Sequence, residues 1–274
     1  LGIAAQSVGL SQAAYNEALA YAKDRKQFGK AIIEFPAVAE ILSLMKAKLD
    51  ASRSLLYETA RFVDVYKALD DIAKERKLTP EERAEQKTFA KLADAFTPLG
   101  KGMGSEFANQ NAYDCIQIHG GSGFMKDYAC ERIYRDSRIT SIYEGTTQLQ
   151  VVAAIRYVTT GAYLARIQEY ENMPVAPELE GLQNRLKSMA SKYAACVTQI
   201  TEAKDQELLD FCARRLVEMA AHIIMGHLMV QDASKSDLFS ESAQVYVRYA
   251  EAEVEKHINF IRKFDKDDLA YYRK

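Results

Sequence analysis

The chain has 274 residues, 48% of them hydrophobic, with 13 Gly, 5 Pro and a formal net charge of -2 at pH 7. This apolar fraction suffices for one large domain or two smaller ones, and it argues against a disordered chain. The near balance of charges argues against a broad basic surface for nucleic acid, and no apolar run reaches the roughly 20 residues of a membrane-spanning helix. The cysteines form no C-x-x-C pair, which argues against a disulfide framework and a zinc site. We expect four reduced core residues: Cys115, Cys130, Cys196 and Cys212.

The first segment favours a helix from Ile3 to Asp24, which the pair Phe28-Gly29 then interrupts. The chain starts at Leu1 in place of an initiator Met and is helical in pattern from the outset. We therefore expect that a longer protein precedes it and that any targeting segment is missing. One face of this helix should carry the buried residues Val8, Tyr15, Leu19 and Ala22.

Residues 35–70 predict a second, long helix of about nine or ten turns, because buried positions recur in alternating steps of four and three. Pro36 suits its first turn, where the missing N–H costs no hydrogen bond. The expected stripe is Val38, Leu42, Met45, Leu49, Ser52, Leu56, Thr59, Val63 and Tyr66. A charged connection of unassigned role, about residues 70–86, should follow.

A third helix is predicted to begin at Thr79, whose hydroxyl and the carboxylate of Glu82 can form a capping box. Pro98 should kink this helix, and the glycines at 100, 102 and 104 allow close backbone approach. The run Gly100 to Gly104 is not read as a nucleotide loop, because it follows a helix and lacks the required spacing. The helix should stop at the glycine-rich segment 119–123.

Shorter elements complete the expected bundle: a helix near 127–135, a turn at 141–145 and a helix at 146–160 closed by Gly161. A Pro-containing linker, 171–177, precedes three further amphipathic helices near 178–203, 205–231 and 236–264. Nothing after this linker alternates like a strand. His222 and His227 lie five apart, which does not place them on one helical face as metal ligands. The predicted domains are 1–165, a helical bundle, and 172–274, a helical extension.

Glu144 stands in the turn just before a helix, flanked by Tyr143 and Gly145. On its own, this position favours an ordinary acid that stabilises the start of the helix by about 0.3–1 kcal/mol. No G-x-S-x-G elbow and no evident Cys/His nucleophile pair supports hydrolysis.

Three separated segments together resemble the acyl-CoA dehydrogenase family in order and approximate spacing. They are Arg25-Lys26-Gln27-Phe28-Gly29, Gln117-Ile118-His119-Gly120-Gly121-Ser122-Gly123-Phe124 and Tyr143-Glu144-Gly145-Thr146-Thr147-Gln148. Arg132, Arg135 and Asp136 also fit the family pattern, whereas Phe35-Pro36 stands where the family often has a polar pair. The resemblance covers residues 1–160 and implies an all-α fold: an antiparallel four-helix bundle of the acyl-CoA dehydrogenase C-terminal type, followed by a helical extension.

The resemblance also implies a reaction and a cofactor. Glu144 would abstract the α-proton of a fatty acyl-CoA thioester while FAD takes a hydride, with Tyr143 and Gly145 beside the substrate. Thr146 and Gln148 would contact the FAD of their own subunit. The FAD of the neighbouring subunit would be contacted by Arg25, Gln27, Phe28, Gln117, Ile118, His119, Gly120 and Gly121.

Partners follow from the same resemblance: electron-transferring flavoprotein as electron acceptor, a homodimer in preference to a tetramer, and no metal. The implied location is intracellular, in the cytoplasm of a bacterium or the mitochondrial matrix of a eukaryote. An acyl-CoA oxidase that passes electrons to oxygen stays open as an alternative. So does a helical assembly module without chemistry, which the intact segment 143–146 opposes.

Overall fold

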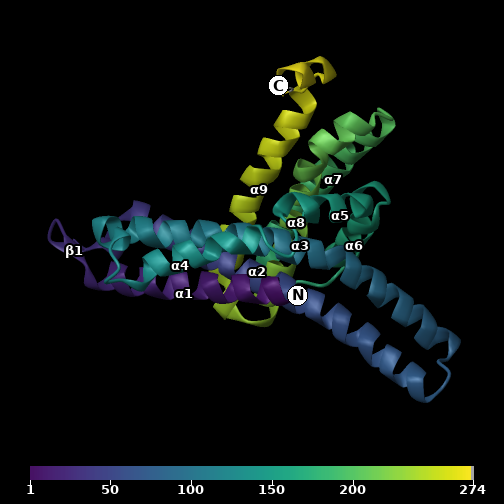
Figure 1. Ribbon diagram of the computed structural model, residues 1–274, viewed down its shortest axis with the longest axis horizontal. Helices are drawn as coiled ribbons and strands as arrows, with labels where there is room; N and C mark the ends of the chain where they lie inside the picture. Colours follow the sequence, from purple (N-terminus) through teal and green to yellow (C-terminus); the bar gives the residue numbers. More distant parts are fainter. Residues whose placement is uncertain (273–274) are drawn as a thin grey trace. The chain divides into compact units, whose positions relative to one another are not determined.

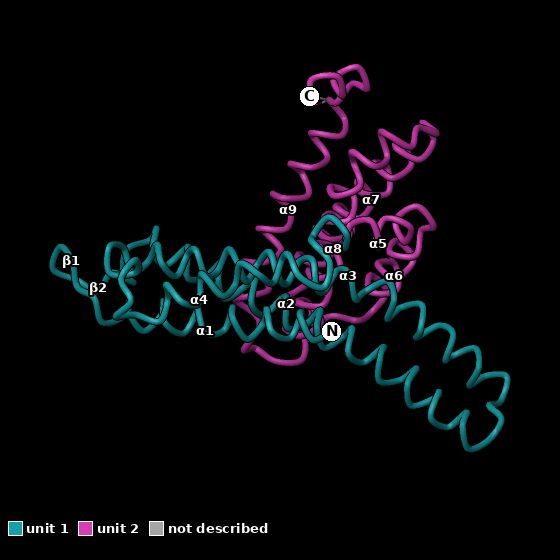
Figure 2. The backbone as a smooth tube through the Cα atoms, in the orientation of Figure 1, with its two compact units in different colours: residues 1–150 teal, residues 151–274 magenta. Residues whose placement is uncertain are grey.

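The computed structural model describes residues 1–272 and is helical almost throughout (Figure 1). The chain divides into two compact units, Leu1–Gln150 and Val151–Lys274 (Figure 2). Over the described residues, no helix combines the length and the apolar character needed to cross a membrane. The helical content of the described residues confirms the predicted all-α fold class.

Unit 1 is built on three long helices, α1 Gly2–Asp24, α2 Pro36–Glu75 and α3 Pro80–His119, which pack on one another. Small residues line the contact between α1 and α3: a Cβ at Gly104 would lie 3.7 Å from the Cβ of Ser7. Two large residues expected on the buried face, Tyr15 and Leu19, are therefore only half-buried. The buried face of α1 instead consists of Ala4, Ser7, Val8, Ser11, Ala14, Ala18 and Ala22.

The predicted charged connection at 70–86 is mostly helical. Helix α2 runs to Glu75 and α3 starts at Pro80, so only four residues connect them, and the two helices project as a hairpin (Figure 1). Thr79 caps α3 as predicted, with its hydroxyl accepting from the Glu82 N–H at 3.2 Å and the Glu82 carboxylate accepting from the Thr79 N–H at 2.9 Å. The guanidinium of Arg76 pairs with Glu82 at 2.6 Å. Because the polar face of a helix can remain solvated, the high charge of residues 70–86 did not show where the helices end.

The predicted stripe of α2 is buried at Leu42, Met45, Leu49, Ser52 and Thr59, while Val38 is half-buried. Leu55, Phe62 and Leu69 are buried at seven-residue spacing, where Leu56, Val63 and Tyr66 were expected. A two-helix hairpin packs like a coiled coil, in which the contact line follows a repeat of 3.5 residues. The edge-to-face contact of Phe62 with Phe96, at 5.0 Å between ring centroids, belongs to this seam.

Between α1 and α2 the chain forms a hairpin that the sequence did not reveal. Strands β1 Lys26–Gln27 and β2 Lys30–Ala31 pair antiparallel through a two-residue turn. Phe28 and Gly29 have φ of 50° and 84°. Two left-handed residues in succession are what the tightest hairpin turns require. As a result, the Phe28 ring is 88% exposed.

Helix α3 continues through Pro98 and ends at His119, as expected. It is followed by η2 Gly120–Phe124, α4 Ala129–Ser137 and η3 Arg138–Ser141. Helix α5 Thr147–Thr159 then begins within unit 1.

Unit 2 contains one helix more than the sequence indicated. Gly161, with φ of 74°, ends α5 and starts α6 Ala162–Glu171. The elements that follow are η4 Pro177–Leu179, α7 Glu180–Glu202, α8 Gln206–Lys235, η5 Asp237–Phe239, α9 Ser240–Lys263 and η6 Lys266–Tyr272. The boundary between the two units lies within α5. The linker between α6 and η4 suggested domains 1–165 and 172–274, and that domain division stays a prediction.

Helix α8 is the core of unit 2. An unbroken run from Met219 to Val230 is buried, and it includes both histidines. His222 is within 3.2 Å of the Tyr246 hydroxyl through its Nδ1, and His227 stacks on Tyr170. These contacts make both histidines packing residues of the core.

Candidate functional site

Glu144 occupies a turn of unusual backbone conformation between η3 and α5. Its φ is 54°, and that of Gly145 is 90°. Left-handed conformation is rare for a residue other than glycine and persists only where surrounding contacts enforce it. The Glu144 side chain is exposed. A long carboxylate is thus held out from the surface by a backbone that an isolated chain would avoid.

Two side chains hold this turn through its carbonyl groups. The ammonium of Lys101, from the middle of α3, donates to the Gly145 carbonyl at 2.5 Å. The amide of Gln150, in the first turns of α5, donates to the carbonyls of Glu144 at 3.2 Å and Gly145 at 3.3 Å. Lys101 is only 5% exposed. In the sequence, Lys101 stands in a glycine run that does not fit a nucleotide loop, and no motif marks Gln150.

The residues on either side of Glu144 are tied to unit 1 as well. The Tyr143 hydroxyl hydrogen-bonds to Gln6 near the start of α1. The Thr147 hydroxyl donates to Glu106 of α3 at 2.7 Å. Thr146 accepts from the Leu149 N–H at 3.4 Å and so caps α5, while Gln148 is exposed.

A pocket of about 640 Å³ lies at the other end of α1. It brings together the two sequence segments that were predicted to contact one flavin. The predicted residues in its wall are Arg25, Gln27, Phe28, Gln117, Ile118, His119, Gly120 and Gly121. The sequence did not single out other lining residues, namely Tyr21, Ile32, Phe35, Ala37, Val38, Ile41 and Ser122.

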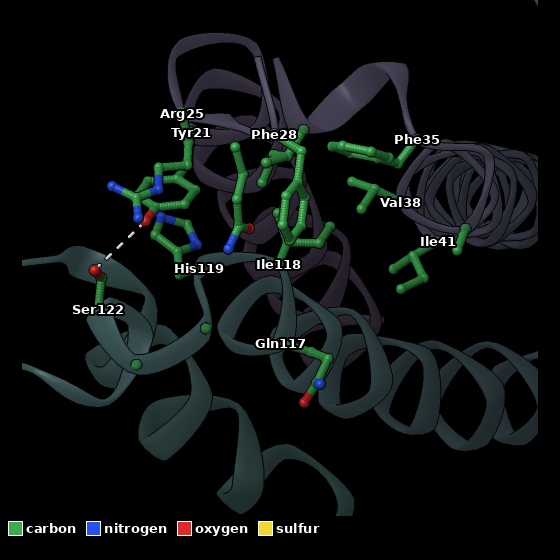
Figure 3. Close-up of a pocket in the computed structure, with 15 residues that line it drawn as sticks. Tyr21, Arg25, Phe28, Phe35, Val38, Ile41, Gln117, Ile118, His119 and Ser122 are labelled. Carbon is green, nitrogen blue, oxygen red and sulfur yellow. Dashed lines mark hydrogen bonds between the residues drawn. The ribbon is translucent and has the colours of Figure 1, made fainter. Parts of the chain in front are cut away.

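The pocket is polar at one end and apolar at the other. Figure 3 shows Tyr21, Arg25 and His119 grouped at one end and Phe35, Val38 and Ile41 at the other. Two contacts connect the residues of the polar end: the rings of Tyr21 and His119 stack at 4.2 Å between centroids, and the Tyr21 hydroxyl donates to Ser122 at 3.4 Å.

His119 presents a defined tautomer to the pocket. Its Nδ1 lies 2.8 Å from the Cys115 carbonyl, which can only accept, so Nδ1 carries the proton. In the neutral ring Nε2 is then an acceptor.

The glycines at this end leave room for a ligand. A Cβ on Gly121 would meet nothing within 4 Å, so packing within the chain does not require a glycine there. Gly120 has a φ of 60° and needs glycine for its conformation, whereas Gly123 is packed against Ile116 and His119. Arg25 is exposed beside this open backbone. A guanidinium next to an accessible Gly-Gly backbone fits a phosphate-bearing group such as the pyrophosphate of FAD.

The pocket and the Glu144 turn are far apart on the same unit. On α1, Gln6 hydrogen-bonds to Tyr143 beside Glu144, and Tyr21 lines the pocket. Gln6 and Tyr21 are separated by roughly 22 Å along the helix, at 1.5 Å per residue. Along α3, Lys101 and His119 are separated by roughly 27 Å on the same basis.

Behind the pocket wall, the fold groups three residues that the sequence spacing had separated. Cys115, His119 and Cys130 are buried, with ligand-type atoms within 4.8 Å of one another. The Nδ1 proton of His119 is committed to the Cys115 carbonyl, and burial raises the pKa of both thiols. The four cysteines are free and buried, as expected, and the contacts of these two are those of core residues.

Comparison with known proteins gives the family. The family description "Acyl-CoA dehydrogenase, C-terminal domain" matches residues 1–156, and "Acyl-CoA dehydrogenase C terminal" matches residues 159–269. The match over residues 1–156 includes both the Glu144 turn and the pocket at the other end of α1. The first spans more than half of the chain. The chain therefore belongs to the acyl-CoA dehydrogenase family.

Similar proteins include the caffeyl-CoA reductase-Etf complex subunit CarC of Acetobacterium woodii, 39% identical over 55% of this chain and 33% of that protein. A 3-(aryl)acrylate reductase of Clostridium sporogenes is 38% identical over 55% of this chain and 33% of its own length. An acyl-CoA dehydrogenase of Bacillus subtilis is 35% identical over 59% and 36%. The chain spans about a third of the length of these relatives.

Among solved structures, an acyl-CoA dehydrogenase from Bacillus anthracis, described as complexed with FAD, matches 98% of this chain and 50% of its own, with a TM-score of 0.74 and 24% identity. This likeness shows a shared fold.

Proposed function

We propose that this chain is the carboxy-terminal part of an FAD-dependent acyl-CoA dehydrogenase in which Glu144 removes the α-proton of an acyl-CoA thioester. The observation that carries the proposal is the exposed Glu144 side chain on a left-handed turn. An acid that only stabilised the start of α5 would not need that conformation, which is uncommon for glutamate. Family membership of residues 1–156 supports the same role.

Each residue group has a separate task in this proposal. The Glu144 carboxylate accepts the α-proton, and exclusion of water around the bound acyl chain strengthens it as a base. Tyr143 and Gly145 border the substrate. When bound, FAD supplies the acceptor for the hydride that leaves the β-carbon. Electron-transferring flavoprotein is the proposed electron acceptor, in keeping with the name of the Acetobacterium woodii relative.

The separation of the two predicted flavin-binding groups within unit 1 supports a homodimer. Thr146 and Gln148 lie near Glu144, whereas Arg25 and Gln117 to Gly121 lie at the other end of α1 and α3. We propose that the first group contacts the flavin of its own subunit and the pocket holds the pyrophosphate and adenosine end of the partner's flavin. Two copies would then complete two sites.

The direct test uses the complete enzyme and follows the α-proton. We expect Glu144→Gln to lower flavin reduction by roughly 10²–10⁴-fold while FAD and acyl-CoA binding persist. The variant should also stop exchange of the substrate α-hydrogen with D₂O, read by NMR. The exposed Glu85→Gln is the control and should behave as wild type. Flavin reduction and exchange at wild-type rates in Glu144→Gln would remove Glu144 from this role.

A second candidate is the reverse reaction, reduction of an α,β-unsaturated thioester. Two of the similar proteins carry the name reductase. The same Glu144 would then deliver a proton to the α-carbon. Rates of flavin reduction by a saturated acyl-CoA and of reduced-flavin oxidation by an arylacryloyl-CoA would separate the two directions. An acyl-CoA oxidase would instead form hydrogen peroxide during aerobic turnover.

A further inference from the structure

The Lys101 ammonium is an unusual group to find inside the bundle. Lysine is almost never fully buried unless paired, yet Lys101 is 5% exposed in the middle of α3. Burial lowers its pKa, and the negative charge of Glu106 acts in the opposite direction. The hydrogen bond that Lys101 makes ends on a backbone carbonyl of the turn at Gly145. The buried Lys101 ammonium, whose burial is unfavourable, thus binds a single backbone carbonyl of the turn.

That point is the residue after Glu144. The Gly145 carbonyl accepts from both Lys101 and Gln150, and the Glu144 carbonyl accepts from Gln150. Two successive carbonyls of the left-handed pair are thus fixed. Without these donors the Glu144 backbone would be free to leave a conformation that costs an L-residue free energy.

A second hydrogen bond to α3 fixes the chain just after the turn. Five residues after Lys101, Glu106 accepts the hydroxyl hydrogen of Thr147 at 2.7 Å. Helix α3 thereby contacts the turn at Gly145 and the chain just after it at Thr147. The rigid helix sets the direction in which the carboxylate leaves the surface.

We propose that Lys101, assisted by Gln150, is a positioning residue that holds the Glu144–Gly145 turn and so aims the Glu144 carboxylate at the substrate. The proposal rests on the proposed role of Glu144. Lys101 contacts the main chain of the turn and not the reacting atoms. Its contribution is to the geometry of proton abstraction.

The test compares Lys101→Met and Gln150→Leu, which remove the donors at similar side-chain volume, in the complete enzyme. We expect Lys101→Met to lower the single-turnover rate of flavin reduction roughly 10–100-fold, because a small displacement of a reacting group has that effect on rate. Substrate Kd should change less than about threefold, since uniform binding is untouched. The isotope effect with α-deuterated substrate should rise. Gln150→Leu should show the same pattern with a smaller loss.

The matched control is Lys91→Met, an exposed lysine of the same helix, which should react as wild type. Glu144→Gln run in parallel separates the two ideas. If it is active, the proposed function has failed. If it is inactive while Lys101→Met and Gln150→Leu reduce flavin at the wild-type rate, the positioning role is wrong. A loss in Lys101→Met that is matched by weaker substrate binding, with no change in isotope effect, also overturns it. Should Lys101→Met not fold, Gln150→Leu decides by the same criteria.

Discussion

The side chain of Leu186 in α7 occupies the space that a Cβ on Gly226 of α8 would need. A Cβ built there falls well inside van der Waals contact with the Leu186 methyl group, and Leu186 is fully buried. Gly226 is therefore a packing glycine, which lets α7 and α8 approach closely.

We expect Gly226→Ala to destabilise unit 2. Helix propensity alone would favour Ala by up to about 1 kcal/mol, but overpacking a buried contact costs about 1–3 kcal/mol. Gly181→Ala in α7 is the control, because its Cβ meets nothing within 4 Å and the variant should gain stability. Urea denaturation monitored by circular dichroism gives both values. Equal stability of the two variants would contradict the packing role.

The stability of unit 2 should fall between pH 6.5 and pH 4. Burial lowers the pKa of His227 from 6.5 to about 4. Above pH 6.5 the residue is neutral in both states; as pH falls toward 4, only the unfolded state takes up a proton, so folding free energy is lost. A shift of this size corresponds to about 3 kcal/mol at its limit. Burial likewise lowers the pKa of His222 to about 4.

His227→Leu should remove the part of the stability loss at low pH that protonation of His227 causes. Its Nε2 has no hydrogen-bond partner among residues 1–272, so the variant should lose little at pH 7. Unfolding free energies at pH 7, 6, 5 and 4.5 should then show a shallower pH dependence than wild type. Met229→Leu, another buried position of α8, controls for repacking. An unchanged slope in His227→Leu would show that His227 does not titrate in this way.

At the hairpin, Thr79→Ala should loosen the start of α3. The Thr79 hydroxyl caps the Glu82 N–H, and losing such a cap costs about 1 kcal/mol. Hydrogen exchange should quicken over residues 70–90 and stay unchanged at 117–123. Thr88→Ala, an exposed helix-interior threonine, should be neutral. Exchange rising equally in both variants would argue against the cap.

In the complete enzyme, Arg25→Met should weaken FAD binding while Lys23→Met should not. Both side chains are exposed near the end of α1, but only Arg25 lines the pocket. A charge-assisted hydrogen bond contributes about 1.5–3 kcal/mol, which corresponds to roughly 10–150-fold in affinity. Isothermal titration of the apoenzyme with FAD measures this. A similar loss in Lys23→Met would indicate general charge attraction instead of a specific contact.

The sequence by itself determined most of the helices, α6 excepted, and the family motifs. The capping box at Thr79 and the stop at His119 were readable because they are local: each depends on residues within one or two turns. Beyond Ser52 the stripe was only partly predicted, because the predicted pattern takes a four-residue step to Leu56, whereas packing against α3 buries Leu55 and Phe62. The charged connection of about residues 70–86 was placed too long, because solvated helices and loops have the same charged composition and only the residues between Glu75 and Pro80 are outside the helices.

Only the tertiary structure decided what surrounds Glu144. Lys101 lies 43 positions before it in the sequence, and no local pattern links an ammonium on one helix to a carbonyl on a later turn. The left-handed φ of Glu144 also has no sequence signal, since glutamate is not a residue that favours it. Periodicity specifies which face of a helix is buried, whereas the partner that a buried polar group meets depends on how the helices are packed together. For that reason the acid was found from its motif, and the groups that hold its turn were found from the fold.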